Sequence, residues 1–455
     1  MLLNSINLLK IMLSKDYKLN GELTPLEGEI DNNYKFETTQ GDTFVLKIYA
    51  RERQQQFLDF QKKILLHLKA KGKSLLVPDV IKTARGHSSS YFTDNDGYKR
   101  NVMLLSWIPG RVWKQVNPHT QNLRYELGFT CGTVSKALDD FDHDFAHRYY
   151  EWDIAKGHWT KEYSSLFESK EQKLILDMIG LFEKIQTEYN ELHKSIVHND
   201  ANDFNCLVSH SILNPKVIAL IDYGDAIYTQ VINDVAISCC YAIMNFEDPL
   251  QASLSIVKGY NQAFSIEEKA LACLYVCIGI RLIISVTKSR INKLKEPKNT
   301  YLQTSDKSAW ELLKKWDSID YQFAHFNFRE ACGFNPHPGY KIFSNWTLSE
   351  TVSLKSLFPS LKKEKVHHLD LSVSSSFFGQ FSEFNDLDWF DYQMNRIQKK
   401  NPKKIISGGY LEPRLLYTDP SYEKIGNYGP ENRCIHLGVD FWVPANTAIH
   451  SFFDA

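Results

Sequence analysis

The sequence predicts an α+β chain with a small strand-rich N-terminal region, a longer and mostly helical region, and a smaller region of short strands at the C-terminal end. Alternating apolar and polar residues at 34–49, around a glycine turn, predict a β-hairpin. From 106 to about 329, apolar residues recur mainly at the three- and four-residue intervals of helices. After about 365 short strand patterns and turns take over, and 455 residues are enough for two or three structural units.

Bulk composition excludes several classes of protein. Hydrophobic residues make up 43% and charged residues 24%, which is typical of a globular chain and not of a disordered one. The formal net charge is −1, so neither nucleic acid nor a membrane surface is expected as a partner. The eight cysteines include no C-x-x-C pair, which favours reduced thiols in a cytoplasmic protein over a zinc ribbon or a disulfide framework.

Three further segments have simple interpretations. Residues 1–14 are apolar but lack a basic start and a small-residue cleavage site, so they predict an amphipathic helix and not a signal peptide. The longest apolar run, 270–286, contains Arg281 and is shorter than the ~20 residues of a membrane span, so it predicts a buried core helix. The basic stretch 288–298 is expected to be a solvated loop.

The elements and boundaries follow from these patterns. Besides the hairpin, we expect a helix at 52–69 and a strand ending near 107, followed by a turn at 108–110. Beyond the helical region, a strand is expected at 368–373 and a helix at 386–398. The expected divisions are two parts of one domain, a linker and a final domain, with boundaries 1–105, 106–345, 346–365 and 366–455.

The most informative segment is 196–208, which contains His198, Asp200 and Asn205 in the spacing H-x-D-x-x-x-x-N. Seventeen residues after Asn205, an apolar strand leads into Asp222 and a glycine turn, and Lys47 lies upstream on a strand. Phosphoryl transfer needs an acid that orients the attacking hydroxyl, an amide and a second acid that hold magnesium, and a lysine that contacts the phosphates. Amide and carboxylate oxygens suit Mg²⁺.

This segment resembles the catalytic loop of the aminoglycoside phosphotransferase and choline kinase superfamily, which has the bilobal protein-kinase-like fold. Residues 23–34 look like the nucleotide loop of its hydroxylysine-kinase-like branch, and 104–111 look like the hinge between the lobes. Residues 233–236 resemble the short acidic motif that follows the metal-binding acid in that family. The resemblance covers about 15–335.

The resemblance implies a role for each matching residue. Asp200 is expected to be the catalytic base, Asn205 and Asp222 to bind Mg²⁺, and Lys47 to bind the phosphates of ATP. The remaining assignments are Gly28 and Trp107 in the nucleotide site, His198 as a residue that holds the loop together, and Asp234 as a structural support of that loop. The alternative for Asp234 is a helix N-cap.

Three features depart from the family pattern. The loop over the phosphates has a single glycine where protein kinases have several. Lys47 lacks an obvious acidic partner on the following helix, where Asp59, Glu52 and Gln61 are the candidates by position. Asn199 stands where glycine is common.

A second motif lies near the C-terminal end. His436 and Asp440, in the spacing H-x-x-x-D and followed by Pro and Thr, resemble the first half of a lysostaphin-type zinc metallopeptidase site. The resemblance implies that both bind Zn²⁺ from one side of a short strand. That family needs a further H-x-H, so the chain is expected to end inside this domain, with zinc and peptidase activity only in a longer parent protein.

The expected function is an ATP- and magnesium-dependent kinase for a small hydroxyl substrate, namely 5-hydroxylysine, ethanolamine, homoserine or an aminoglycoside. An acidic pocket for the substrate amine is expected, to which Asp203 or Asp225 contributes. The alternatives are a nucleotide-binding pseudokinase or scaffold, and the peptidase reading of a longer protein. The resemblance also suggests an aminotransferase-fold phospho-lyase, absent from this chain, as a downstream partner domain.

Overall fold

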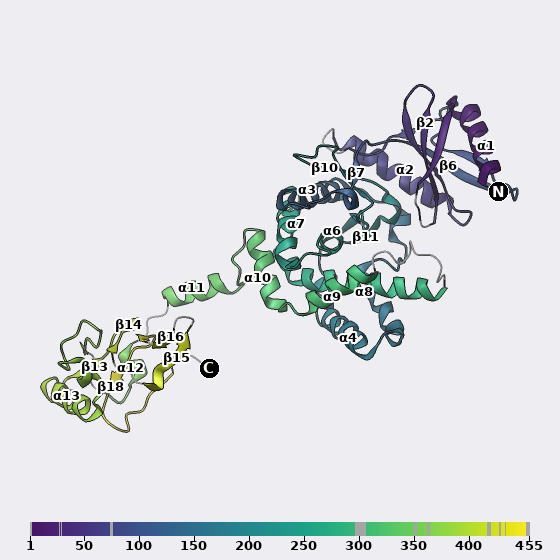
Figure 1. Ribbon diagram of the computed structural model, residues 1–455. Helices are drawn as coiled ribbons and strands as arrows, with labels where there is room; N and C mark the ends of the chain where they lie inside the picture. The colour runs from purple at the N-terminus through teal and green to yellow at the C-terminus, as the bar shows by residue number, and fades with distance from the viewer. Residues whose placement is uncertain are drawn as a thin grey trace. The chain divides into compact units, whose positions relative to one another are not determined.

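The computed structural model describes residues 2–26, 28, 30–72, 76–295, 306–349, 353–361, 365–415, 420–426, 429–432 and 434–451. It divides into two compact units, Met1–Tyr340 and Lys341–Ala455 (Figure 1). The mixed α+β fold, with an antiparallel N-terminal sheet and a helical region, agrees with the predicted fold class.

The first unit begins with an antiparallel sheet of order β1-β2-β3-β6-β4, with β5 also paired to β6. Its strands are β1 (Gly21–Leu26), β2 (Asn32–Thr38), β3 (Thr43–Ile48), β4 (Val80–Ile81), β5 (Ser90–Thr93) and β6 (Lys99–Ser106). The predicted hairpin is formed by β2 and β3, whose register places Asn33 opposite Lys47.

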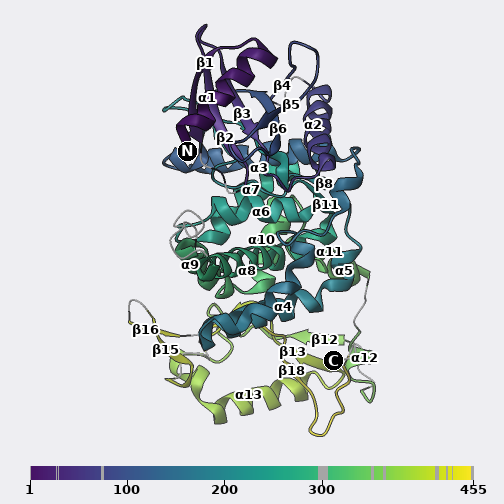
Figure 2. The same ribbon diagram turned by 90° about the vertical axis from the view of Figure 1, so that its right-hand side faces the viewer.

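Two helices cover opposite faces of this sheet (Figure 2). They are α1 (Leu2–Met12), which continues into the short π-helix η1 (Leu13–Tyr17), and α2 (Gln55–Ala70). Because side chains alternate along a strand, Val102 and Leu104 pack with the first helix, whereas Met103 packs with the second. Lys47 lies between Leu46 and Ile48, which both belong to the cluster of α1. Lys47 therefore faces the α2 side.

The larger part of the first unit is helical around one large apolar core. Its helices are α3 (Gln121–Leu138), α4 (Ser169–Lys184), α5 (Gln186–Asn190), α6 (Ile232–Ala242), α7 (Pro249–Ala263), α8 (Leu271–Lys295), α9 (Asp306–Asp317) and α10 (Tyr321–Ala331), with the 3-10 segments η2 (Trp113–Gln115), η3 (Asp144–His147), η4 (Ile154–Leu166) and η6 (Glu268–Ala270). Helices α3 and α7 pack closely because a Cβ at Gly128 would lie 1.9 Å from the carbonyl oxygen of Ile256.

Short strands interrupt the helices where the sequence predicts it. They are β7 (Arg111–Val112), β8 (Lys194–Val197), β9 (Cys206–Val208), β10 (Val217–Leu220) and β11 (Ile227–Gln230), with the 3-10 turn η5 (Tyr223–Asp225). They form an antiparallel sheet of order β10-β9-β7 and a ribbon of β11 with β8. These strands carry the candidate catalytic segment on the loops between them.

Helix α8 confirms one prediction and corrects another. The helical stretch Glu268–Lys295 is long and apolar enough to cross a membrane by composition, but 94% of its most apolar window is buried inside the structure, as a core helix requires. The solvated loop expected from 288 is wrong, because α8 continues to Lys295. Ser289 is buried, and Arg290 donates to the carbonyl oxygen of Leu166, so neighbouring segments hold this turn in helical form.

The second unit is small and loop-rich. Its elements are α11 (Tyr340–Ser349), α12 (Leu354–Leu357), β12 (Lys365–His368), η8 (Phe381–Asn385), α13 (Leu387–Lys400), β13 (Lys404–Ser407), β14 (Glu412–Pro413), η10 (Pro420–Tyr422), β15 (Glu423–Gly426), β16 (Gly429–Asn432), β17 (Ile435–His436) and β18 (Phe441–Trp442). A sheet of order β12-β13-β18 packs with α13 around Phe378, Met394 and Ile406.

The strand expected at 368–373 is wrong, because β12 covers 365–368. Beyond it the backbone turns away from the sheet: the amide of Ser372 donates to the carboxylate of Asp370, and the amide of Leu371 donates to Glu412. The predicted helix is α13, and Asp386 caps it by accepting from the amide of Trp389 at 3.0 Å.

Candidate active site

Asp200 lies in the loop between β8 and β9 with partners from distant parts of the chain. Its Oδ2 accepts from Asn205 Nδ2 at 2.7 Å and from Asn202 Nδ2 at 2.9 Å. Its Oδ1 lies 3.4 Å from Arg281 Nη2, and its side chain is 19% exposed. Burial raises the pKa of Asp200 well above its usual value, nearby Asp225 adds to this, and Arg281 opposes it. The carboxylate is thus enclosed but still reachable.

Asn205 and Asp222 are brought together by the backbone. The amide of Ile221 donates to the carbonyl oxygen of Asn205 at 2.9 Å, which joins the two segments just before Asp222. Asn205 Nδ2 donates to both the carbonyl oxygen and the carboxylate of Asp200. Because that nitrogen is engaged, the amide oxygen of Asn205 is the atom left to meet a cation.

Asp222 follows β10 in a left-handed conformation (φ 58°), which Asp tolerates better than most residues. Its Oδ1 accepts from Lys47 Nζ at 3.0 Å and from the amide of Gly224 at 3.3 Å. Desolvation raises its pKa, but Lys47 and the Gly224 amide outweigh it, so the pKa lies below the usual value. With 44% of its side chain exposed, Asp222 is an ionised and accessible carboxylate.

Lys47 has a second acidic neighbour that the sequence analysis missed. Its Nζ lies 3.8 Å from Asp31 Oδ2, from the residue just before β2. The three candidates by position are not its partners. Asp59 pairs with two lysines of its own helix, Gln61 accepts from the hydroxyl of Tyr49, and Glu52 is exposed ahead of α2. The register of β2 and β3 is the signal that could have identified Asp31.

His198 and Asp234 form hydrogen bonds that hold the loop containing Asp200. His198 lies within hydrogen-bond distance of the carbonyl oxygen of Ile221 (3.0 Å) through Nε2, and its Nδ1 accepts from the amide of Asp200 at 3.2 Å. Asp234 is fully buried and accepts from the amide of Asn199 at 2.9 Å and from Ser135 Oγ at 2.8 Å. The N-cap interpretation of Asp234 is wrong, because the N-cap position of α6 is Val231.

Gly28 and Trp107 lie on the N-terminal sheet side. A Cβ at Gly28 would meet the carbonyl oxygen of Asp31 at 2.7 Å, so this close approach of the backbone favours glycine. Trp107 is half-buried just after β6, and Lys35 Nζ lies 5.6 Å from the centre of its ring. Both residues therefore lie against residues of the β2 segment.

Arg281 and its aromatic neighbours form the inner wall of the site. Arg281, which is 2% exposed, donates to the carbonyl oxygen of Trp152 at 2.7 Å and to the hydroxyl of Tyr241 at 3.1 Å. Its guanidinium also lies over both aromatic rings. Sequence reasoning noted Arg281 only as a charge in an apolar run, although a lone arginine in a core helix is itself a signal, since buried charges need a partner.

Two further acids, Asp225 and Asp203, are the candidates for an amine-binding pocket, and Asp225 lies near Asp200. Tyr150 is hydrogen-bonded to Asp225, and burial together with that acid raises the pKa of Tyr150 well above its usual value. Asp203 has a pKa raised to about 6 by burial, with Lys114 opposing the shift. One carboxylate oxygen of Asp203 is buried without a hydrogen-bond partner among the described residues.

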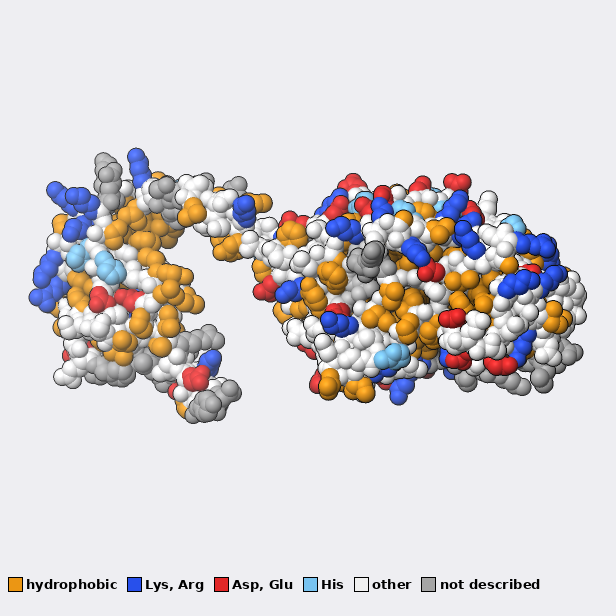
Figure 3. All heavy atoms as spheres, turned by 90° about the horizontal axis from the view of Figure 1, so that it is seen from above, with side chains coloured by type: hydrophobic (Ala, Val, Ile, Leu, Met, Phe, Trp, Pro, Cys, Tyr) orange, Lys and Arg blue, Asp and Glu red, His pale blue; other side chains and the backbone are white. Residues whose placement is uncertain are grey.

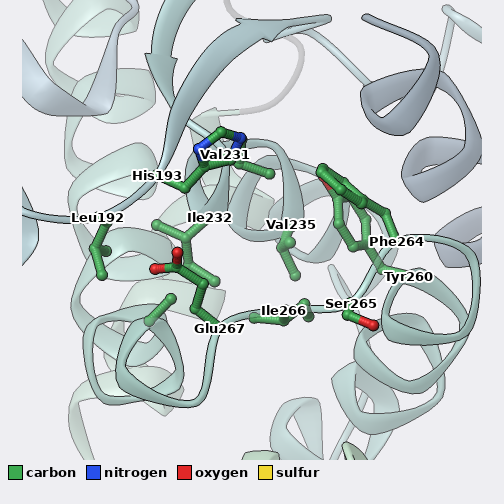
Figure 4. Close-up of a pocket in the computed structure, with 11 residues that line it drawn as sticks. Leu192, His193, Val231, Ile232, Val235, Tyr260, Phe264, Ser265, Ile266 and Glu267 are labelled. Atoms are coloured by element: carbon green, nitrogen blue, oxygen red, sulfur yellow. The ribbon is translucent and has the colours of Figure 1, made fainter. Parts of the chain in front are cut away.

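A cavity elsewhere in the first unit is too small to be the active site. It lies beside the start of α6 and is lined mainly by apolar side chains, with His193 and Glu267 at its edge (Figure 4). Its volume of about 30 Å³ suits a water molecule and not a nucleotide.

In the second unit, His436 and Asp440 meet, but not as the sequence analysis expected. His436 Nε2 lies 3.3 Å from Asp440 Oδ2, although His436 is in β17 and Asp440 lies in the loop before β18. The buried Arg414 donates to Asp440 at 2.5 Å and to Glu412 at 2.7 Å. Across the described residues there is no group of three or more potential metal-binding side chains. This pair, with its acid neutralised by arginine, does not fit a zinc site.

Comparison with known proteins places the first unit. A family model described as "Phosphotransferase enzyme family" matches residues 22–270. The chain is 24% identical to hydroxylysine kinase of Mus musculus over 318 residues, covering 65% of this chain and 84% of that protein. It is 25% identical to the Xenopus laevis hydroxylysine kinase over 316 residues, covering 64% of this chain and 84% of that protein.

Two solved structures share the fold. An amicoumacin kinase in complex with AMP-PNP and Ca²⁺ has a TM-score of 0.53 and 17% identity, covering 69% of this chain and 96% of that one. A microcompartment-associated aminopropanol kinase has a TM-score of 0.55 and 15% identity, covering 70% and 99%. With more than half of its residues matched by the family model, the chain belongs to the phosphotransferase enzyme family and is a small-molecule kinase.

Proposed function

We propose that this kinase transfers the γ-phosphoryl group of ATP to the hydroxyl of a small amino alcohol or hydroxy amino acid. The observation that carries the proposal is the convergence of Asp200, Asn205 and Asp222, which belong to two segments joined by the bond from the Ile221 amide to Asn205. An acid for the hydroxyl, with an amide and a second acid for magnesium, is the set that phosphoryl transfer requires.

Each residue then has a role. Asp200 orients the substrate hydroxyl and accepts its proton on the carboxylate. Asn205 and Asp222 hold magnesium, for which an amide oxygen and an ionised, accessible carboxylate are suitable ligands. Lys47 contacts the phosphates, and Gly28 and Trp107 border the nucleotide. When bound, ATP supplies the phosphoryl group and Mg²⁺ neutralises the charge that develops on it.

The substrate is proposed to carry an amine. Asp225, which lies near Asp200 and is hydrogen-bonded to Tyr150, suits an ammonium group, because carboxylates bind ammonium groups. The relatives named as hydroxylysine kinases make 5-hydroxylysine the first candidate. Ethanolamine, homoserine and aminoglycosides follow, and we propose that the reaction takes place in the cytoplasm.

The second unit is proposed to be related to lysostaphin-type domains on the strength of the His436-x-x-x-Asp440 motif and the contact between these two side chains. No zinc chemistry is assigned to it, because Arg414 already neutralises Asp440. On the larger body in Figure 3, acidic and basic side chains are interspersed, which agrees with a small-molecule substrate.

The test is substrate-dependent ATP consumption by the full chain with Mg²⁺, across amino alcohols, hydroxy amino acids and aminoglycosides. Asp200→Asn is expected to lower kcat by about a thousandfold, in the range of general-base contributions, while MgATP still binds. Asp142→Asn, at an exposed acid that pairs with His147, is the matched control and should leave kcat unchanged. MgATP binding without turnover on any hydroxyl donor would instead indicate a pseudokinase.

A further inference from the structure

We propose that Asp31, the residue just before strand β2, is the acid that positions Lys47 for the nucleotide phosphates, in place of an acid on helix α2. This inference rests on the proposed function, in which Lys47 binds those phosphates. It begins from a mismatch: the three polar residues near the right position in sequence, Asp59, Glu52 and Gln61, are all engaged elsewhere or exposed.

The sheet register explains why Asp31 can take this position. Asn33 lies directly opposite Lys47 across the β2–β3 pair. Residues two apart on a strand share a face, so Asp31 is the diagonal neighbour of Lys47 on the α2 side of the sheet. Gly28 has no side chain and so leaves room for the carbonyl oxygen of Asp31, which would lie 2.7 Å from a Cβ there.

The Asp31 side chain is built into its position. It is 6% exposed, and its Oδ1 accepts from the amide of Ala50 at 2.9 Å and lies 3.4 Å from Arg53 Nε. Its Oδ2 is the atom that faces Lys47 Nζ, at 3.8 Å. One oxygen therefore anchors the carboxylate to the backbone after β3, and the other is directed at the lysine.

A second acid matters because Asp222 has another task. Lys47 carries its charge on a flexible four-carbon chain, and Asp222 lies 3.0 Å from it. In the proposed function Asp222 binds magnesium, so it cannot also be the sole anchor of the lysine. Asp31 directly precedes the strand that pairs with β3 and is held by the amide of Ala50, so it keeps the ammonium in place whatever Asp222 binds. The same ion pair also links the loop after β1 to the nucleotide site.

Helix α2 contributes in another way. Gln61 accepts from the hydroxyl of Tyr49, and its Nε2 would lie 2.9 Å from a Cβ at Gly224. The amide thus packs against the turn that follows Asp222 without supplying a negative charge. In this proposal the segment before β2 positions Lys47, and α2 has a packing role at this place.

The experiment is a double-mutant cycle on the full chain, read out as the MgATP dissociation constant by calorimetry. Asp31→Asn is expected to weaken MgATP binding by about tenfold in the native background and to have no further effect in Lys47→Ala, since coupled residues are not additive. Asp59→Asn is the matched control and should change nothing. Arg53→Gln tests whether the other partner of Asp31 is responsible, and its affinity should stay native.

The outcomes separate the two proposals. An equal loss from Asp31→Asn in both backgrounds, or a loss in Asp59→Asn instead, overturns the role of Asp31. Coupling between Asp31 and Lys47 in MgATP binding supports it even if no hydroxyl substrate is turned over, a result that would overturn only the proposed function. Asp31→Asn could also lower Tm. If Arg53→Gln lowers Tm by the same amount and keeps native MgATP affinity, the stability loss comes from the Asp31–Arg53 pair. The coupling between Asp31 and Lys47 in MgATP binding then decides the proposal.

Discussion

Two aspartates in this molecule lie beside a buried arginine, and only one of them is in a usable site. Asp200 is 3.4 Å from Arg281, keeps 19% of its side chain exposed, and is surrounded by amides and a second, accessible acid. Asp440 is 2.5 Å from Arg414, which also holds Glu412, and its histidine neighbour has no third metal-binding partner among the described residues. Both motifs have the right spacing. A motif becomes a site when distant segments complete it and leave an acid free to act.

The comparison predicts that loss of an acid lowers activity in the cluster around Asp200 and lowers stability in the cluster around Asp440. The largest effect is expected for Asp222→Asn, which removes the proposed magnesium ligand. It should lower kcat by about a thousandfold at saturating MgATP, as the loss of a main electrostatic group in a transition state does. Lys47 retains Asp31, so Tm should change little. Steady-state kinetics and calorimetry test this.

Asp440→Asn in the same kinase assay is the control, and it should leave kcat native. A fall in kcat for this variant would mean that the second unit supports the reaction, and the contrast between the clusters would fail. Native kcat in Asp222→Asn would remove Asp222 from the metal site.

The second prediction concerns stability in the C-terminal cluster. Asp440→Asn leaves the buried Arg414 with Glu412 as its remaining acid and should destabilise the second unit by about 1–3 kcal/mol, the cost of a buried charged group that loses a hydrogen-bond partner. Hydrogen exchange should locate the loss in α13 and β13. The exposed Asp391→Asn serves as the control, and equal exchange in both variants would show that the arginine does not depend on Asp440.

The third prediction uses the pKa of Asp203, which burial raises to about 6. The protonated carboxyl is favoured in the folded state, so its contribution to stability is complete below about pH 4 and is lost as pH rises through 6. Asp203→Asn should therefore match the native Tm below pH 4 and exceed it above pH 6. The gain should be smaller than the loss at Asp440, because the new amide also needs a partner. An equal Tm difference at pH 3.5 and 7.5 would contradict the shift.

The residues that sequence analysis identified depend on local spacing, whereas those that it missed depend on contacts between distant segments. The hairpin, the H-x-D-x-x-x-x-N loop and the Asp222 turn depend on local spacing, and the fold brings Asp200, Asn205 and Asp222 together as that spacing indicates. Asp31 and Arg281 depend on strand register and helix packing, which join positions 16 and 81 residues apart. No local pattern specifies such pairs. The same limit explains α8, where contacts with other segments kept a polar stretch helical.

The smallest expected effect is on stability and concerns Asn199, which the sequence analysis singled out and whose surroundings only the fold reveals. Its φ of 63° is a left-handed conformation, which explains why glycine is common at this place in the family pattern. Both polar atoms of its buried side chain lack a partner among the described residues, while its backbone amide donates to Asp234. Asn199→Gly keeps that backbone bond, relieves the conformation and removes the unsatisfied amide.

We therefore expect Asn199→Gly to stabilise the first unit by about 1 kcal/mol, because a buried unpaired polar group costs more than the added freedom of glycine. Asn199→Ala should instead destabilise it, since at positive φ alanine is disfavoured relative to both glycine and asparagine. Thermal unfolding of both variants tests the pair. If glycine lowers Tm as alanine does, the Asn199 amide has a partner in solution, and the loop beneath Asp200 is held by the side chain as well as by the Asp234 bond.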